Sequence, residues 1–432
     1  MLQLQFLQRD KSAALERLSK RGGEDFSPLV EAALAEDQKR REGLSELERL
    51  RAESNKIAKA VGAAMSKGDA GAADVARQQT AELKAAIAER EKAVKDAEER
   101  LHELLVRLPN APHDSVPAGK SAEGNVVVHE RPREPAVPAE PRPHWDVLAE
   151  LGTVDFERGV KLTGSGFPVY VGAGAKLQRA LVRFFLDRAE AAGYLEIQAP
   201  HLVNAETAFA TGQLPDKEGQ MYFAGADNLY LSPTAEVPIT NLYRDEILAE
   251  ERLPIKLCGY TPCFRREAGS YGKDVRGLNR VHQFDKVEIV QIVRPEDAYD
   301  ALEEMTQYAE SLLDALELPY RRLLLCGGDM GFASAKTYDL EAWSAGQERW
   351  LEVSSVSCFE TFQTNRLKLR YRPAAGGKPV LAYTLNGSAL ALPRIVAALL
   401  ENRRQSDGSV ALPACLHPYF GAESLTPGGK TL

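Results

Sequence analysis

The segment from Phe264 to Glu288, FRREAGSYGKDVRGLNRVHQFDKVE, brings together the residue types that bind a nucleotide. It begins with two arginines and a glutamate, continues through a basic, glycine-rich stretch and ends in an alternating strand. Arginine recognises phosphate oxygens with two parallel hydrogen bonds, an aromatic ring stacks on a base, and a carboxylate binds a small polar ligand. The two-residue period of a strand puts four such side chains on one face: His282, Phe284, Lys286 and Glu288. The alternative interpretation is a solvated edge hairpin with ordinary surface charges.

Length and composition limit the class of protein. A chain of 432 residues is too long for one core and predicts two or three domains. Its 44% hydrophobic and 27% charged residues are typical of a soluble globular protein. The net charge of −8 implies that any nucleic acid is bound through local basic surfaces.

Cysteine spacing and hydropathy predict the compartment. The five cysteines contain no CxxC pair, which predicts reduced thiols and no zinc site of the usual spacing. The N-terminus lacks the apolar region of a signal peptide, and no apolar run reaches the ~18–20 residues that span a membrane. We therefore expect a cytoplasmic protein that binds no membrane.

Residues Ser27 to about Leu108 consist mainly of helix formers, with one break at Lys67–Asp74. Core positions at alternating steps of three and four residues form a heptad seam on each of two helices: Gly43, Leu47, Leu50, Ser54, Ile57 and Val61, then Leu83, Ile87, Arg90, Val94, Ala97, Leu101, Leu104 and Leu108. The short turn predicts an antiparallel coiled-coil hairpin whose arms of ~35–40 residues extend ~50–60 Å. A dimerisation or packing arm is the alternative. Because several seam positions are polar, we expect the hairpin to contribute little to stability and to serve mainly to extend to a distant partner.

A change of composition around Pro109–Pro112 marks the predicted end of the N-terminal domain, residues 1–110. The segment Arg131–His144 holds five prolines and is predicted to be neither helix nor central strand. We therefore expect a proline-rich linker region over residues 111–144.

The remainder, residues 145–432, mixes helical and strand patterns. An amphipathic helix over Ala175–Tyr194 precedes a strand over Leu195–Pro200. Many closely spaced strands without regular βαβ alternation predict an α+β domain, an antiparallel sheet flanked by helices. Neither a P-loop nor a Rossmann phosphate-binding motif occurs.

The opening segment resembles the second signature motif of class II aminoacyl-tRNA synthetases and, among these, of bacterial-type seryl-tRNA synthetases. The resemblance extends over nearly the whole chain. The predicted helix and strand ending at Pro200 resemble the family's first motif, which implies a homodimer. The string LAYTLNGSALALPRIVAALLENRR resembles the third, a strand turning at Asn386–Ser388 into a helix that carries Arg394 six residues in. Ser388 is otherwise a helix N-cap.

The resemblance implies roles for single residues. Arg265 would bind the α-phosphate and the amino-acid carboxylate, Phe284 would stack on adenine, and Glu288 would accept a hydrogen bond from the serine hydroxyl. Glu267 would bind the adenine amino group and Glu236 would lie near the serine ammonium. The implied catalytic residues are Arg265, Glu352 and Arg394. The implied serine site is Thr234, Ala235, Glu236, Arg265, Glu288, Asn386 and Ser388. The implied ATP site is Arg265, Arg266, Glu267, Arg280, Val281, Phe284, Glu352, Val353, Ser354, Ser355 and Arg394.

The resemblance also implies the reaction and its partners. Serine and ATP would give seryl-adenylate, and the seryl group would pass to the 3′ end of tRNA(Ser), with tRNA(Sec) as a further candidate. Glu352 and Ser355 would hold Mg²⁺, and the helical hairpin would bind the tRNA. Two alternatives are an amino-acid-activating enzyme that loads a carrier protein, whose relatives lack the hairpin, and an inactive paralogue, which would have lost Arg265, Glu288 or Glu352.

Overall fold

A computed structural model describes residues 1–66, 70–131, 138, 140–216, 218–268 and 276–427. The chain divides into two compact units. The first comprises residues 1–19 and 24–109, and the second comprises residues 20–23 and 110–432. Among the described residues, no helix is both long enough and apolar enough to cross a lipid bilayer.

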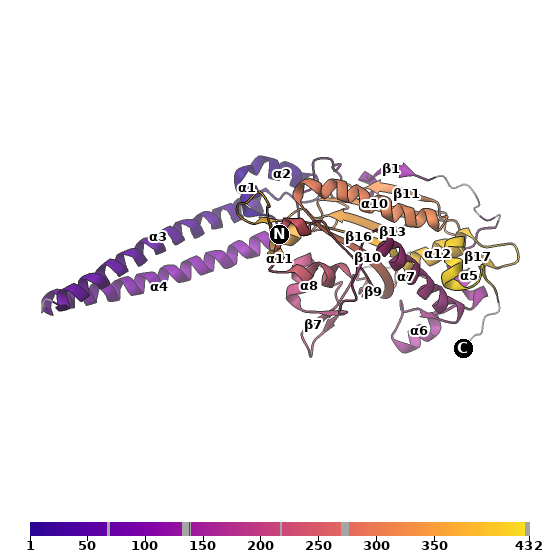
Figure 1. Cartoon of the computed structure of the whole chain (residues 1–432), viewed down its shortest axis with the longest axis horizontal. Coiled ribbons are helices and arrows are strands. Elements are labelled where there is room, and N and C mark those ends of the chain that lie inside the picture. The colour runs from indigo at the N-terminus through magenta and orange to yellow at the C-terminus, as the bar shows by residue number, and fades with distance from the viewer. Residues whose placement is uncertain (67–69, 132–137, 139, 217, 269–275, 428–432) are drawn as a thin grey trace. The chain divides into compact units, whose positions relative to one another are not determined.

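The first unit is a helical hairpin with two short helices at its base (Figure 1). Its helices are α1 (Leu4–Arg9), α2 (Lys11–Ser19), α3 (Ser27–Ser66) and α4 (Ala70–Arg107). Ion pairs show that α3 and α4 are antiparallel: Arg100 pairs with Glu36 at 3.2 Å, and Arg51 pairs with Glu91 at 2.7 Å. The predicted break at 67–74 is shorter than expected, because α4 already begins at Ala70; residues 67–69 of that prediction lie outside the described residues.

The seam of the hairpin is closely packed only near its base. Gly43 permits a close approach, since a Cβ added there would lie 2.8 Å from the Cγ2 atom of Val94. The predicted seam differs at one step: Leu105 is buried and Leu104 only partly so. Arg90, also predicted for the seam, is exposed. Among the described side chains between residues 51 and 93, none is buried, so the distal half contributes little to the core.

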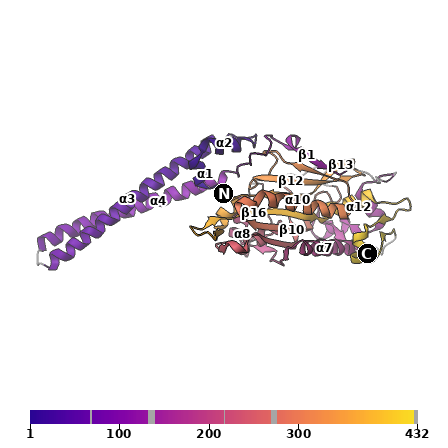
Figure 2. The same ribbon diagram turned by 45° about the horizontal axis from the view of Figure 1, so that its top comes forward.

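The second unit contains an eight-stranded sheet, whose labelled strands lie around the helix α10 in the view of Figure 2. Its strand order is β1 (Val126–Glu130), β11 (Tyr320–Leu324), β12 (Lys336–Ser344), β13 (Arg349–Cys358), β16 (Tyr383–Ala391), β10 (Gln283–Val293), β9 (Ile255–Phe264) and β4 (Leu195–Glu196). Neighbouring strands are antiparallel, except that β4 runs parallel to β9. The α+β prediction is therefore confirmed, with one parallel pair at the edge.

Helices cover one face of this sheet. Apolar side chains of α7 (Ala173–Ala191), α10 (Ala298–Ala315) and α12 (Leu392–Asn402) pack against alternate strand residues such as Val287, Ile289 and Val356. The remaining helices are α5 (His144–Leu151), α6 (Phe156–Leu162), α8 (Ala205–Thr211), α9 (Glu236–Thr240), α11 (Phe362–Leu367) and α13 (His417–Phe420). The opposite face of β10 carries the polar residue Glu288 and, further along the strand, Val290 and Ile292, which belong to two smaller apolar clusters.

In the described part of the chain, ten further short strands form four small sheets around the main one. They are β2 (Val154–Asp155) with β3 (Val169–Tyr170); β5 (Leu202–Val203), β7 (Leu229–Leu231) and β6 (Phe223–Ala224); β15 (Val380–Leu381), β14 (Arg370–Arg372) and β8 (Ile247–Ala249); and β17 (Val410–Ala411) with β18 (Ser424–Leu425). Three-residue 3₁₀ helices complete the connections.

The predicted linker region 111–144 is wrong in part. Its residues Val126–Glu130 form β1, which pairs antiparallel with β11 at the edge of the main sheet. Asn110 is buried, and its amide donates to the carbonyl oxygens of Ala333 and Phe359 at 2.9 and 2.8 Å. The five prolines on which the linker prediction depended all lie in Arg131–His144, after β1 ends. Residues 132–137 and 139 of the predicted linker lie outside the described residues.

Candidate active site

A cavity of about 800 Å³ lies on the face of the central strands opposite α7, α10 and α12. It is lined by residues from β10, β13 and β16, by the first residues of α9 and α12, and by the segments that follow α8 and β9 and that precede β10 and β12. All but two of the site residues predicted from the sequence line it. The two exceptions are Ala235, which is buried against Ile239 and Leu257, and Arg266, whose guanidinium lies 5.7 Å from the ring centre of Tyr222.

A buried group of polar side chains forms one end of the cavity. Glu288 is 1% exposed, and its carboxylate accepts hydrogen bonds from Asn386 Nδ2 at 2.9 Å and, at 3.4 Å, from Ser388 Oγ. Lys286, 5% exposed, places its ammonium 2.5 Å from the same carboxylate. Buried charges occur in pairs because an isolated one is costly to desolvate. This end therefore offers matched hydrogen-bonding groups to a small polar ligand.

The third motif is arranged differently from the prediction. Asn386, Gly387 and Ser388 lie within β16, and α12 begins only at Leu392, so Arg394 is the third helical residue and not the sixth. The strand continues because β16 stays paired with β10 as far as Ala391, whereas its pairing with β13 ends at Gly387. Ser388 is therefore no helix N-cap, and its hydroxyl faces Glu288.

Glu236 forms the next part of the wall as the first residue of α9. It is 6% exposed and accepts a hydrogen bond of 2.7 Å from Gln363 Nε2. Burial, and then repulsion from the charge of Glu288, raises the pKa of the Glu236 carboxyl from its usual 4.5 to about 7. A ligand ammonium placed here would favour the carboxylate form and would be held by it.

Glu236→Gln is expected to remove a pH dependence of folding stability. Because the pKa of Glu236 is raised in the folded state, its contribution to stability is fully present below the unfolded pKa. That contribution is lost as the pH rises through about 7, and it amounts to about 3 kcal/mol. The variant should therefore gain stability over the wild type between pH 5 and 8, as measured by urea unfolding. Glu251→Gln, at an exposed glutamate, is the control; a constant difference between wild type and Glu236→Gln would contradict the assignment.

Basic and aromatic side chains form the other end of the cavity. The guanidinium of Arg265 lies 5.3 Å from the ring centre of Phe284, which comes from the neighbouring strand. Arg280 donates to Glu267 at 3.1 Å, so two residues of the implied ATP site contact one another. Together these side chains provide positive charge for phosphates and an aromatic ring for a base. Residues 269–275 of the predicted hairpin lie outside the described residues.

Glu352 and Ser355 line the cavity together because β13 contains a bulge. Leu340 pairs with Ser354, but the next residue of β12 pairs with Glu352, so Val353 is the extra residue. Val353 turns into the apolar core. In a regular strand residues 352 and 355 would point to opposite faces.

These oxygen donors fit a divalent cation. Asp339 lies opposite Ser355 on β12, and its Oδ1 atom is buried without a hydrogen-bond partner. Burial, and then the charge of Glu352, raises the pKa of the Asp339 carboxyl well above its usual value. A hard cation bound by oxygen ligands at Glu352 would relieve this repulsion.

Arg394 connects the segment before β10 with strand β13 across the cavity. Its Nε donates to the carbonyl oxygen of Asn279 at 3.0 Å, and its Nη1 donates to that of Glu352 at 2.7 Å. The sequence interpretation gave no role to three residues of the site: Lys286, Asn279 and Gln363. Lys286 could have been recognised from its two-residue spacing from Glu288, which placed it on the correct strand face. Asn279 and Gln363 could not, because they act through contacts with residues distant in sequence.

Comparison with known proteins identifies the family. A model described as the seryl-tRNA synthetase N-terminal domain matches residues 1–112, and one of the class II tRNA synthetase core domain (G, H, P, S and T) matches residues 223–403. The serine–tRNA ligase of Salinibacter ruber is 53% identical over 422 residues, which cover 98% of each chain. The chain belongs to the seryl-tRNA synthetase family.

Solved structures agree. The seryl-tRNA synthetase of Pyrococcus horikoshii, crystallised with ATP, is 35% identical with a TM-score of 0.93, over 99% of this chain and 100% of that one. The cytoplasmic serine–tRNA ligase of Naegleria fowleri, in complex with AMP, is 25% identical with a TM-score of 0.87, over 99% of both chains. The predicted family, fold class and enzyme type, an ATP-dependent ligase forming an aminoacyl-tRNA, are confirmed.

Proposed function

We propose that this cavity activates L-serine with ATP to seryl-adenylate and then transfers the seryl group to the 3′ end of tRNA(Ser). The observation that carries the proposal is the joining, in one cavity of a seryl-tRNA synthetase family member, of a buried polar end at Glu288 with an arginine-rich end at Arg265 and Arg394. The reaction serves translation, so we place it in the cytoplasm.

The polar end is suited to serine in size and charge. Glu288 would accept a hydrogen bond from the serine hydroxyl, with Ser388 and Asn386 holding its carboxylate in place. Glu236 would bind the ammonium, and Thr234 lies beside it on the cavity wall. Alanine has no hydroxyl to donate to Glu288, so this hydrogen bond would be lost at a cost of about 1–3 kcal/mol or more, and the site discriminates against alanine.

The arginine-rich end would bind ATP and orient its α-phosphate. The serine carboxylate attacks the α-phosphorus in line, and pyrophosphate leaves; no side chain acts as a nucleophile. Arg265 would neutralise charge on the α-phosphate, and Arg394 and Arg280 would bind the other phosphates. Phe284 would stack on the adenine.

Glu352 and Ser355 would hold Mg²⁺, with Asp339 behind Ser355. When bound, the ion neutralises charge on the phosphate oxygens. The bulge at Val353 is what lets both oxygen donors reach the cavity.

The α3–α4 hairpin would bind tRNA(Ser), and its length suits the reach to a long nucleic acid. We extend the same proposal to tRNA(Sec), because the acceptor end would enter the same cavity. A homodimer is supported by the edge strand β4, where the apolar side chain of Leu195 is 62% exposed. A second copy packed against this edge would cover it.

Amino-acid-dependent exchange of pyrophosphate into ATP tests the proposal. Serine should support exchange at least about 10²-fold better than alanine or glycine, since neither has a hydroxyl for Glu288. Threonine should be intermediate or poor, because its extra methyl group must fit beside the hydroxyl. Equal exchange with all four amino acids would contradict the assignment of the polar end to serine. Charging of tRNA(Ser) and tRNA(Sec) transcripts then measures the second step.

A further inference from the structure

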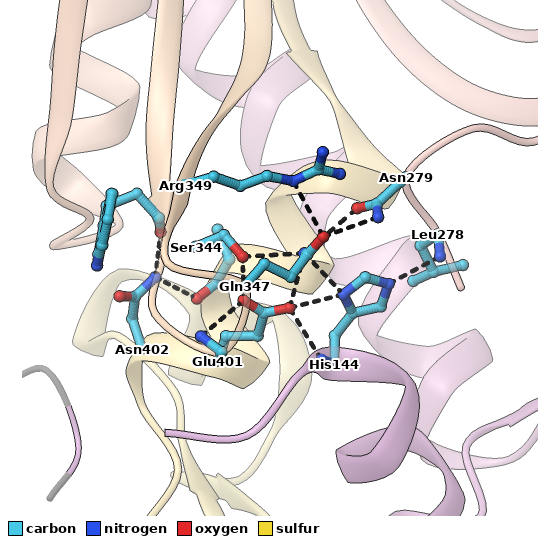
Figure 3. A network of polar contacts seen from close by, with 11 residues as sticks. His144, Leu278, Asn279, Ser344, Gln347, Arg349, Glu401 and Asn402 are labelled. Carbon is cyan, nitrogen blue, oxygen red and sulfur yellow. Dashed lines mark hydrogen bonds and ion pairs between the residues drawn. The ribbon is translucent and has the colours of Figure 1, made fainter. Parts of the chain in front are cut away.

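A buried polar network lies beside the cavity, around His144 at the start of α5 and Glu401 near the end of α12 (Figure 3). Both side chains are fully buried. Glu401 Oε1 accepts a hydrogen bond from the backbone nitrogen of His144 at 2.9 Å and contacts its Nδ1 at 2.7 Å. Glu401 Oε2 accepts from Ser344 Oγ and from the backbone nitrogen of Gly346. The carboxylate is thus fully satisfied.

The other ring nitrogen of His144 contacts the segment that leads into β10. The backbone N–H of Leu278 donates to His144 Nε2 at 2.8 Å. Because Nε2 is an acceptor here, the ring proton of a neutral imidazole must lie on Nδ1, where it is donated to Glu401. Burial raises the pKa of Glu401, but hydrogen bonds from His144 and Ser344 outweigh it and leave the pKa below its usual value. Glu401 is therefore a carboxylate that fixes the tautomer of His144.

The fit between this imidazole and the segment is close. Gly277 has a φ of +66°, and a Cβ added there would lie 2.3 Å from His144 Nε2. One residue earlier, the guanidinium of Arg276 lies 4.7 Å from the ring centre of Trp145. Two consecutive residues of α5 thus hold two consecutive residues of the segment.

The network continues to the cavity through Gln347. Its Nε2 donates to Glu401 Oε1 at 3.0 Å, and its Oε1 accepts from Asn279 Nδ2 at 2.9 Å. Figure 3 shows Gln347 between Glu401, His144 and Asn279. Leu278, Asn279 and Arg280 all line the cavity. The carbonyl oxygen of Asn279 in turn accepts the hydrogen bond from Arg394 Nε.

We propose that His144 is a positioning residue for ATP binding: together with Glu401 and Gln347 it holds residues 277–280 so that Arg280 and Arg394 point at the phosphates. This inference rests on the proposed function and deepens it. His144 itself does not line the cavity. The serine end is held instead by the pairing of β10 with β16, in which the network takes no part. Loss of His144 therefore affects the two substrates unequally.

The test is pyrophosphate exchange with ATP and serine varied separately. His144→Ala is expected to raise the KM for ATP about tenfold and to leave the KM for serine within about twofold, from loss of one backbone hydrogen bond and of the packing behind it. Gln347→Ala removes the hydrogen bond between Gln347 and Asn279, and it should raise the KM for ATP severalfold. Because Gln347 is only partly buried, this variant should disturb the fold less than His144→Ala. Since both act on one segment, the double variant should show less than the product of the two effects.

Asn402→Ala is the matched control. Asn402 is buried next to Glu401 and donates to the carbonyl oxygens of Trp343 and Ala398, without touching residues 277–280. It should lower the melting temperature and leave both KM values unchanged. If His144 has a purely structural role, His144→Ala will lower kcat in proportion to the folded fraction and change neither KM. That result would overturn the proposal, and so would an equal rise of both KM values. If His144→Ala does not fold, the two KM values of Gln347→Ala provide the same test. Absence of serine-dependent exchange in the wild type would instead contradict the proposed function.

Discussion

Replacement of Glu288 by alanine should lower serine-dependent pyrophosphate exchange by a factor of about 10² or more, because the serine hydroxyl loses a charge-assisted hydrogen bond in a buried pocket. Binding of ATP should be nearly unchanged, since Glu288 lies at the polar end of the cavity and the arginines at the other. The measurement is the exchange rate at saturating ATP with serine varied. Serine activation near the wild-type rate would contradict the pocket assignment.

The ion pair between Glu288 and Lys286 makes a second variant necessary. Glu288→Ala leaves the buried ammonium of Lys286 without its partner at 2.5 Å, which destabilises the fold in addition to any effect on serine. The double variant Glu288→Ala/Lys286→Met removes both charges. We expect it to recover most of the lost melting temperature while exchange with serine stays low. Recovery of both together would mean that the single variant failed through stability, and that Glu288 is not the acceptor for serine.

Shortening the hairpin should separate the two steps of the reaction. Deleting residues 51–92 and joining Leu50 to Ala93 through a short glycine turn removes the part in which no described side chain is buried. The base, with Leu47, Leu50, Val94 and Ala97, stays intact. Exchange should remain near the wild-type rate, whereas transfer to tRNA(Ser) should fall on the order of 10²-fold, because the 3′ end is no longer delivered to the cavity.

Salt dependence provides a control for this result. Residues 51–92 carry eight basic and six acidic side chains, although the whole chain has a net charge of −8. If these basic residues contact phosphates, tRNA binding by the full chain should weaken with added salt, and the shortened protein should show a smaller slope. Loss of exchange together with transfer would mean that the distal hairpin is structural. Retention of both would place the tRNA elsewhere.

Local periodicity in the sequence was sufficient to predict much of the fold. The two long helices follow from their heptad seam, because side chains three and four residues apart share a face whatever the partner. The alternation in β10 correctly placed Phe284, Lys286 and Glu288 on the cavity face. Arginine, carboxylate and aromatic residues in that order also predicted the kind of ligand, since few other residue types bind phosphate, ammonium and a base.

Pairing between distant strands decided the rest. The bulge at Val353 puts Glu352 on the face of Ser355, and the pairing of β16 with β10 extends β16 past Ser388; neither is visible in the order of residues along one strand. The strand β1 exists because β11 offers it a free edge. His144, in a segment predicted as linker, reaches Leu278 only in the folded chain. The sequence by itself determined which chemical groups were available, whereas hydrogen bonds between residues far apart in the chain decided where each group points.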